Sequence, residues 1–212
     1  CSCNKKIKFM KSLSKSVKRE FLYHLKLPKN IYLPLSVFAV LFAIFIVLEL
    51  EELFIFANVL IATTLTILIV SESAFQDDYR TGILEKRVSE SNDLLSYMLS
   101  KHLAQIFLIF LPMCLLSMLF TAEISWPYFF AYMIMAMTLN NFFQLGSAIS
   151  LKKNNALNAL IMLPLLIPYI ILIKDVFEMY SLANFYFLLA YFIFSDVFCN
   201  YLTIKILRIQ VK

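Results

Sequence analysis

Long apolar runs alternate with short polar interruptions along most of the chain. The runs occupy 31–48, 53–70, 94–120, 128–151, 156–173 and 182–207. A helix needs roughly 20 mostly apolar residues to cross a bilayer, and each run is near that length. Strands of a membrane barrel would instead alternate over about 10 residues, a pattern that the sequence lacks. The pattern predicts an all-α integral membrane protein with six transmembrane helices.

A charged stretch at 72–93, called here the docking stretch, separates the second run from the third. Its apolar residues Phe75, Tyr79 and Ile83 recur at every fourth position, the spacing of one helix face. A polar segment with an apolar stripe, held near the membrane on both sides, suits a surface that binds a soluble partner. We therefore expect a cytoplasmic docking helix between spans 2 and 3. A solvated loop is the alternative.

The first 30 residues are basic and end near Pro28. Apolar residues lie four apart, and lysines occupy the other faces; these apolar residues are Phe9, Leu13, Val17, Phe21 and Leu25. This pattern predicts an amphipathic helix on the membrane surface, where each cation adds about 1 kcal/mol of attraction to anionic lipid. An untethered basic tail is the alternative. We divide the chain into a basic cytoplasmic segment, 1–30, and a permease-like transmembrane domain, 31–212.

Composition supports the membrane assignment, and charge sets the orientation. Hydrophobic residues make up 61% of the chain and charged residues 16%, whereas soluble domains carry about 25% charge. With a cytoplasmic N-terminus and six spans, all of the 19 Lys and Arg residues except Lys174 fall on the cytoplasmic side. Cytoplasmic loops hold an excess of cations. Both termini and the docking stretch are therefore expected in the cytoplasm.

Two expected spans carry polar residues at helical spacing. These residues are Asn140, Gln144 and Ser147 in the fourth span and Asp196, Asn200 and Thr203 in the sixth. An ionisable residue near mid-membrane is unfavourable unless it faces the interior, which makes Asp196 a functional-site hypothesis. The alternative is hydrogen bonding that fastens one helix to another.

Two prolines lie four residues apart in the fifth span, Pro164 and Pro168. Each removes a backbone donor, so the helix should kink and can act as a hinge. Prolines are also common in membrane helices, so a role in packing alone is the alternative. His102 begins the third span and is a weaker candidate for a ligand at the cytoplasmic surface.

Motifs for catalysis are missing from the sequence. It contains no GxxxxGK[ST], HExxH or GxSxG, and its 2 glycines could hardly form a phosphate-binding loop. The cysteines Cys1, Cys3, Cys114 and Cys199 show no CxxC or metal-ligand spacing. We expect a non-catalytic subunit that binds no metal and no nucleic acid, with any ATPase activity in a partner.

The chain resembles the haem exporter protein B (CcmB) family over nearly its whole length. The docking stretch is similar to the family's pattern Glu-x-x-Phe-x-x-Asp-x-x-x-Gly-x-Leu-Glu through Glu72, Phe75, Asp78, Gly82, Leu84 and Glu85. Lys152-Lys153 followed by Leu163-Pro164 and Ile167-Pro168 resembles the family's basic loop and Leu-Pro-x-x-Ile-Pro run, and the ending Leu207-Arg208-Ile209 is a weaker match. Thr81 stands where the family usually has Asp, and Asn154-Asn155 where it has Gly-Gly.

The resemblance implies the membrane subunit of an ABC-type complex in cytochrome c maturation. Its partners would be an ATP-binding subunit, other membrane proteins that handle haem, and the lipid bilayer. Haem would reach this subunit only through the complex, and we assign no bound cofactor. The resemblance also implies a bacterial inner membrane, with the mitochondrial inner membrane as the alternative.

Our first hypothesis is that the docking stretch transmits nucleotide-driven motion from the ATP-binding subunit to the spans. Phe75 and Ile83 would enter an apolar groove of that subunit, and Asp77, Asp78 and Glu85 would meet its basic residues. A stand-alone secondary transporter that uses Asp196, and a membrane scaffold without transport, are the alternatives.

Overall fold

The computed structural model of the protein describes residues 2–47, 55–72, 74–89, 94–121, 124–152, 156–178 and 181–211. Over these residues it is helical and contains no strand. The helices are α1 (Ser2–Lys26), α2 (Lys29–Val47), α3 (Ile55–Glu72), α4 (Gln76–Arg80), α5 (Ile83–Ser89), α6 (Leu94–Gln105), the π-helix η2 (Ile106–Phe110), α7 (Leu111–Thr121), α8 (Trp126–Ile149), α9 (Ala156–Glu178) and α10 (Leu182–Gln210). The predicted all-α class is therefore confirmed.

Three segments of the described chain are long and apolar enough to cross a membrane: Ile55–Arg80, Leu94–Thr121 and Leu182–Gln210. A fourth arises if Leu13–Lys26 and Lys29–Phe45, which meet at a bend of 68°, form one broken span. Helix α8 is not among them, and it carries Asn140, Asn141 and Gln144 in its second half. These findings support a membrane protein, while the number of six spans stays a prediction.

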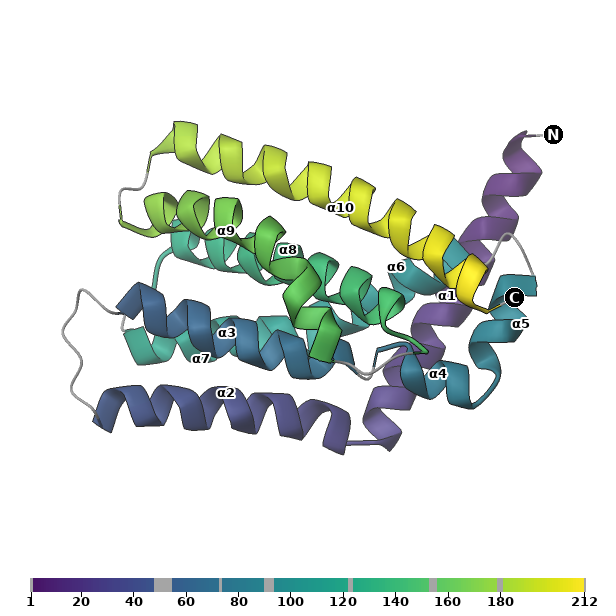
Figure 1. Ribbon diagram of the computed structural model, residues 1–212, viewed down its shortest axis with the longest axis horizontal. Helices are drawn as coiled ribbons and strands as arrows, with labels where there is room; N and C mark the ends of the chain where they lie inside the picture. Colours follow the sequence, from purple (N-terminus) through teal and green to yellow (C-terminus); the bar gives the residue numbers. More distant parts are fainter. Residues whose placement is uncertain are drawn as a thin grey trace.

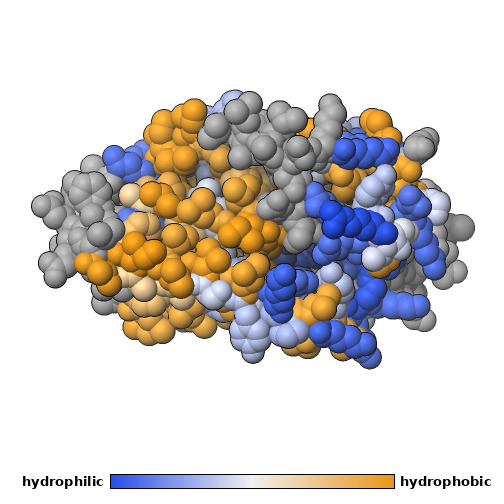
Figure 2. Space-filling view, turned by 60° about the horizontal axis from the view of Figure 1, so that its bottom comes forward, coloured by the Kyte–Doolittle hydropathy of each residue, from blue (hydrophilic) through white to orange (hydrophobic). Residues whose placement is uncertain are grey.

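The long helices lie side by side along the long axis of the molecule. Figure 1 shows α2, α3, α7, α8, α9 and α10 in this arrangement, with α1, α4 and α5 gathered at one end. Both ends of the chain lie at that same end. Figure 2 shows hydrophilic residues concentrated there and apolar residues over the rest of the visible face. We call the part formed by α1, α4, α5 and the last turn of α10 the polar end.

Helix α8 occupies the centre of the bundle. It packs against α3, α9 and α10, and most of its residues are buried. Tyr132 and Met135 on α8 are fully buried, together with Phe38 of α2 and Tyr169 of α9. Aromatic rings continue this core outward, because Tyr169 stacks on Tyr191 of α10 with ring centroids 5.4 Å apart. The apolar core therefore holds α8 from several sides.

A second apolar cluster joins the docking stretch to the bundle. Phe75 and Leu84 pack with Leu94, Tyr97 and Met98 of α6, and the end of α10 contributes Leu207. Phe75, Leu84 and Tyr97 have no exposed surface. Burial of a large apolar side chain contributes about 1.5–3 kcal/mol, so this cluster fixes the docking stretch firmly to α6.

The docking stretch is not one helix, contrary to the expected four-residue stripe. Helix α4 ends at Arg80 and α5 begins at Ile83. Between them Gly82 has a φ of 72°, a left-handed conformation that glycine adopts without the strain of a side chain. Its N–H donates to the carbonyl of Tyr79 at 3.1 Å and closes the turn. The turn separates Ile83 from the face that carries Phe75.

The third predicted span contains an irregularity that hydropathy did not predict. Five residues, Ile106–Phe110, form a π-helix between α6 and α7. Pro112 lies two residues further on and has no N–H to donate to the preceding turn, which favours a wider turn before it. The π-helix follows Gln105 directly, and Gln105 takes part in the polar contacts described below.

Candidate functional site

Asp78 of α4 is the anchor of the docking stretch. Its Oδ2 lies 2.8 Å from Nζ of Lys101 on α6, and the two side chains are only 13% and 11% exposed. The hydroxyl of Tyr97 donates a hydrogen bond to the same oxygen. Lys101 also donates to the backbone carbonyl of Ala74. A charge pair that is largely buried and hydrogen-bonded on several sides depends on both partners, because either one alone would remain uncompensated.

Lys101 is held by aromatic faces as well as by Asp78. Its Nζ lies 5.2 Å from the ring centroid of Tyr97 and 5.8 Å from that of Phe75. Both distances are within the range of cation–π attraction. The guanidinium of Arg19 on α1 lies 5.8 Å from the Tyr97 ring centroid. Tyr97 is therefore contacted by α1, α4 and α6 residues together.

Helix α1 turns a polar face toward α6 and the docking stretch. Ser16 and Glu20 are buried, and Glu20 forms an ion pair with its neighbour Arg19. The hydroxyl of Tyr23 donates to Oδ2 of Asp77 at 3.3 Å. Leu22 and Leu25 stay exposed on other faces. An apolar surface thus remains available for contact with the membrane, and the predicted role of α1 as a surface helix stays a prediction.

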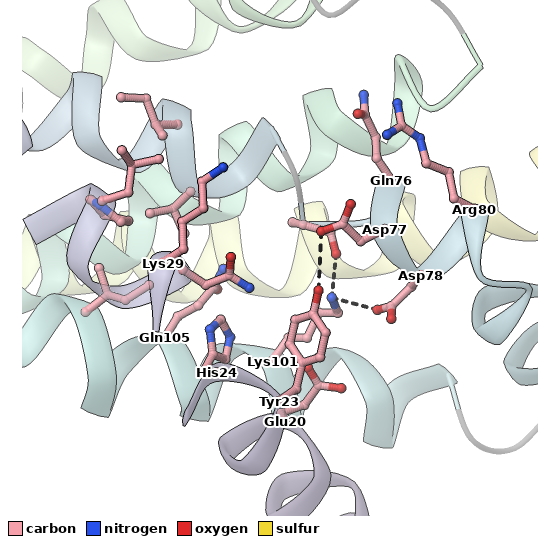
Figure 3. Close-up of a pocket in the computed structure, with 17 residues that line it drawn as sticks. Glu20, Tyr23, His24, Lys29, Gln76, Asp77, Asp78, Arg80, Lys101 and Gln105 are labelled. Atoms are coloured by element: carbon pink, nitrogen blue, oxygen red, sulfur yellow. Dashed lines mark hydrogen bonds and ion pairs between the residues drawn. The ribbon is translucent and has the colours of Figure 1, made fainter. Parts of the chain in front are cut away.

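A pocket of about 390 Å³ opens between α1, α2, α4 and α6. Most of its lining residues are charged or polar, and they are Glu20, Tyr23, His24, Lys29, Asn30, Gln76, Asp77, Asp78, Arg80, Lys101 and Gln105. Figure 3 shows Asp78 and Lys101 joined at one side, Tyr23 reaching Asp77, and Lys29 and Arg80 well apart from each other. Apolar lining residues include Leu33 of α2, Ile69 of α3 and Ile109 of the π-helix η2. The pocket therefore lies where the apolar bundle meets the polar end.

The structure divides the expected docking residues into two groups. Asp77 and Glu85 are exposed, and Gly82 and Ile83 are partly exposed. Phe75 and Leu84 are fully buried within the chain itself, so Phe75 cannot enter a groove of a partner as expected. Burial in the second apolar cluster is more favourable for this ring than exposure to water. The side chain of Glu72 and the residues 90–93 lie outside what the structure describes.

A network of amide side chains crosses from α6 to α8 within the bundle. Oε1 of Gln105 accepts hydrogen bonds from Asn140 at 3.0 Å and from Gln144 at 2.7 Å. Oε1 of Gln144 lies 2.8 Å from Nε2 of His102. All four side chains are buried. We call His102, Gln105, Asn140 and Gln144 the amide network. The expected stripe on α8 thus faces α6, and His102 points into the bundle rather than to the surface.

Asp196 lies in a second group of polar contacts, between α8 and α10. Its Oδ1 accepts hydrogen bonds from Asn200 at 2.9 Å and from Asn141 of α8 at 3.3 Å. Asp196 is partly buried, and Asn141 is fully buried. Hydrogen bonds of this kind fasten helix to helix in a membrane protein. The structure therefore gives Asp196 a packing role, and any function in transport stays a prediction.

The two prolines expected to form a hinge lie inside a continuous helix. Helix α9 runs from Ala156 to Glu178 and includes Pro164 and Pro168, whose side chains are both exposed. Exposed prolines on one helix face leave the opposite face free to pack. A hinge at this point stays a prediction.

Lys101, Tyr97, Gln105 and Asn141 belong to these sites but were not predicted as functional residues. Lys101 and Tyr97 lie within a predicted span, 23 and 19 positions after Asp78 in sequence. No local spacing relates them to the docking stretch. Gln105 could have been found, because it follows His102 by three positions, which places the two on one helix face.

The sequence matches one protein family, described as CcmB protein, over residues 37–204. The match includes the docking stretch, α6, α8 and the greater part of α10. Helix α1 lies outside the matched residues. Comparison with curated proteins gives no significant match.

Proposed function

Because this chain belongs to the CcmB family of membrane components of haem export in cytochrome c maturation, we propose that it is a permease-like subunit of an ABC-type complex. In this proposal a partner subunit hydrolyses ATP, and the chain couples that reaction to haem delivery or to release of the haem-loaded chaperone. The observation that carries the proposal is the attachment of the docking stretch to α6 through Asp78 and Lys101.

The partner would bind the exposed surface of α4 and α5. Asp77 and Glu85 are exposed there, and acidic side chains complement basic residues on a partner and speed its association. In this proposal Asp78 would have a structural role, because its carboxylate is already bound by Lys101 and Tyr97. Asp77 and Glu85 would therefore recognise the partner, and Asp78 would hold the surface in place.

Motion of α4 would reach the centre of the bundle through α6. Lys101 faces the docking stretch, while His102 and Gln105 on the same helix bind Gln144 and Asn140 of α8. A helix transmits displacement because its backbone hydrogen bonds make it stiff along its axis. A coupling route of this kind also needs a segment with two arrangements. The π-helix η2, which begins directly after Gln105, would supply it.

We propose six spans with both termini in the cytoplasm of a bacterial inner membrane. Support comes from the alternating direction of the long helices and from the gathering of both termini at the polar end (Figure 1). Exposed cations on α1, α5 and α10, among them Lys15, Lys86 and Lys205, lie at this end. This distribution follows the rule that cations accumulate on the cytoplasmic side.

The proposal is tested by affinity purification of the protein together with its complex. The variant D77K/E85K reverses two exposed charges on the docking stretch, and D175K reverses an exposed acid of α9 as the matched control. We expect the ATP-binding subunit to copurify with the wild type and D175K but not with D77K/E85K. Equal recovery with all three proteins would contradict docking through α4 and α5.

A stand-alone secondary transporter is the second candidate, and the hydrogen-bonded Asp196 favours it. Asn141 and Asn200 both donate to its carboxylate, and a proton or cation could bind the same group. Uptake that depends on pH, by protein purified without a partner, would support this function. Loss of this uptake in D196N would identify Asp196 as the proton or cation site.

A further inference from the structure

Two cations that line the pocket at the polar end, Lys29 and Arg80, lie outside the ion pairs that the structure shows among the described residues there. Asp78 is paired with Lys101 and Glu20 with Arg19. Lys29 and Arg80 remain, and neither has an ion pair or hydrogen bond in the part of the chain that the structure describes. Asp77 is the carboxylate that faces them, and it already accepts a hydrogen bond from Tyr23. The charged lining residues are three cations and three acids, which balance. With Arg19 counted, which pairs with Glu20 from outside the lining, and His24 neutral, the described side chains in and beside the pocket have a surplus of one positive charge.

The lining of the pocket combines charged and apolar residues. Lys29 is the first residue of α2, and Arg80 is the last of α4. The apolar part of the lining includes Leu33 and Pro34 of α2, Ile69 of α3 and Ile109 of η2. A polar group bound to the charged residues would therefore have an apolar surface next to it. Molecules with a charged head and an apolar tail fit such a site.

A buried hydrogen-bonding group at the pocket wall is unsatisfied. Nδ1 of His24 is buried and has no hydrogen-bond partner within the described residues. The His24 side chain also lines the pocket. Buried polar atoms in proteins usually have a partner, so one without a partner needs an explanation. A ligand oxygen that accepts a hydrogen bond from Nδ1 would be the missing partner.

We propose that this pocket binds the head group of an anionic phospholipid. Its phosphate would lie between Lys29 and Arg80, which would attract it from opposite sides of the pocket, and a head-group hydroxyl would donate to Asp77. Its acyl chains would follow Leu33 and Ile69 toward the bilayer. Basic pockets between membrane helices on the cytoplasmic side bind lipid head groups in this way. The volume of about 390 Å³ lies within the usual range of small-ligand sites.

Native mass spectrometry of the full chain, purified in detergent without the ATP-binding subunit, tests this proposal. The protein is mixed with phosphatidylglycerol or with phosphatidylcholine, and retained lipid is counted. We expect phosphatidylglycerol to be retained, and we expect K29Q/R80Q to reduce its retention by roughly tenfold, since two charged contacts are lost. The variant K152Q/K205Q removes two exposed cations outside the pocket and should retain the lipid as the wild type does.

A variant that is expected to increase lipid retention makes the test more specific. D77N removes the carboxylate that opposes the phosphate and should increase retention of phosphatidylglycerol. All substituted side chains are exposed, so gel filtration and thermal unfolding should match the wild type. Equal retention by K29Q/R80Q and K152Q/K205Q would overturn the proposal, as would equal retention of the two lipids.

Soluble glycerol phosphate separates a lipid from a free phosphate ester. If it displaces phosphatidylglycerol at a similar concentration, the apolar part of the pocket adds nothing, and a lipid is the wrong ligand. If it binds far more weakly, the acyl chains contribute as proposed. The ATP-binding subunit is not needed for any of these measurements, so their failure would leave the proposed coupling function untouched.

Discussion

The protein has two buried polar clusters on the same helix, and they are built differently. At the polar end, Lys101 forms a charged pair with Asp78. Within the bundle, one to four residues further along α6, His102 and Gln105 form hydrogen bonds with amides of α8. Ion pairs are strongly unfavourable in a hydrocarbon core, whereas neutral amides can satisfy one another there. The position along α6 thus determines which kind of polar contact is present.

The comparison also separates two mechanical roles. The charged pair attaches a short external element that a partner can reach, and the amide network attaches α6 to the central helix. Loss of one member of the pair should release the docking stretch and leave the bundle intact. Loss of the network should loosen α6 on α8 and leave the docking stretch attached to α6. The predictions below test this separation.

The largest effect is expected from K101M. It leaves the carboxylate of Asp78 largely buried without its cation, which destabilises the folded state by about 3–5 kcal/mol. Chemical unfolding in detergent measures this change. The double variant K101M/D78L removes both charges and should recover most of the lost stability. An equal loss in the single and double variants would show that the uncompensated charge of Asp78 is not the cause of the loss.

A smaller effect is expected from Q105L. It removes the acceptor shared by Asn140 and Gln144, and each buried donor left unpaired costs about 1–3 kcal/mol in proteins generally. Membrane proteins show smaller couplings, averaging about 0.6 kcal/mol. A double-mutant cycle of Q105L and N140L measures the coupling directly. A coupling energy of zero would contradict the amide network as a unit.

Substitution of Gly82 should reduce stability by a similar or smaller amount. An added Cβ would have no atom within 4 Å, so G82A acts through backbone strain alone. That strain is about 1–2 kcal/mol for an L-residue in the left-handed region. G82N should be milder, because asparagine tolerates this conformation. Hydrogen exchange of α4 and α5 measures the effect, and unchanged protection in G82A would show that the turn does not need glycine.

The smallest effect on stability is expected from D196N. The amide side chain keeps an oxygen that Asn141 and Asn200 can reach, so thermal unfolding should change by less than about 1 kcal/mol. Activity of the assembled complex should also be retained if Asp196 only joins α8 to α10. Loss of activity with unchanged stability would favour a proton or cation site at this position.

The pattern of apolar residues predicted where the helices lie. It could not predict which helices contact one another. The runs at 94–120 and 182–207 correspond closely to Leu94–Thr121 and Leu182–Gln210. Hydropathy could not predict the π-helix, because the apolar run is continuous through Ile106–Phe110. The stripe of Phe75, Tyr79 and Ile83 failed as one face because Gly82 interrupts the helix. A local feature overrode a regular spacing there.

The candidate site was predictable in location but not in construction. The charge of the docking stretch identified Asp77, Asp78 and Glu85, yet sequence alone gave all three acids the same role. Only the fold brings Lys101 to Asp78, and that contact separates an anchoring acid from the two exposed ones. Burial of Phe75 has the same origin, because the surface that covers it comes from α6 and the end of α10.

The central claim is that the exposed surface of α4 and α5 binds an ATP-binding subunit. A photo-crosslinking residue at position 85, compared with one at the exposed position 175, tests it most directly. The assembled complex is irradiated, and the crosslinked protein is identified by mass spectrometry. We expect the ATP-binding subunit to be crosslinked from position 85 and not from position 175. Crosslinking from position 175 alone, or from neither position in a complex that still contains the subunit, would contradict the claim.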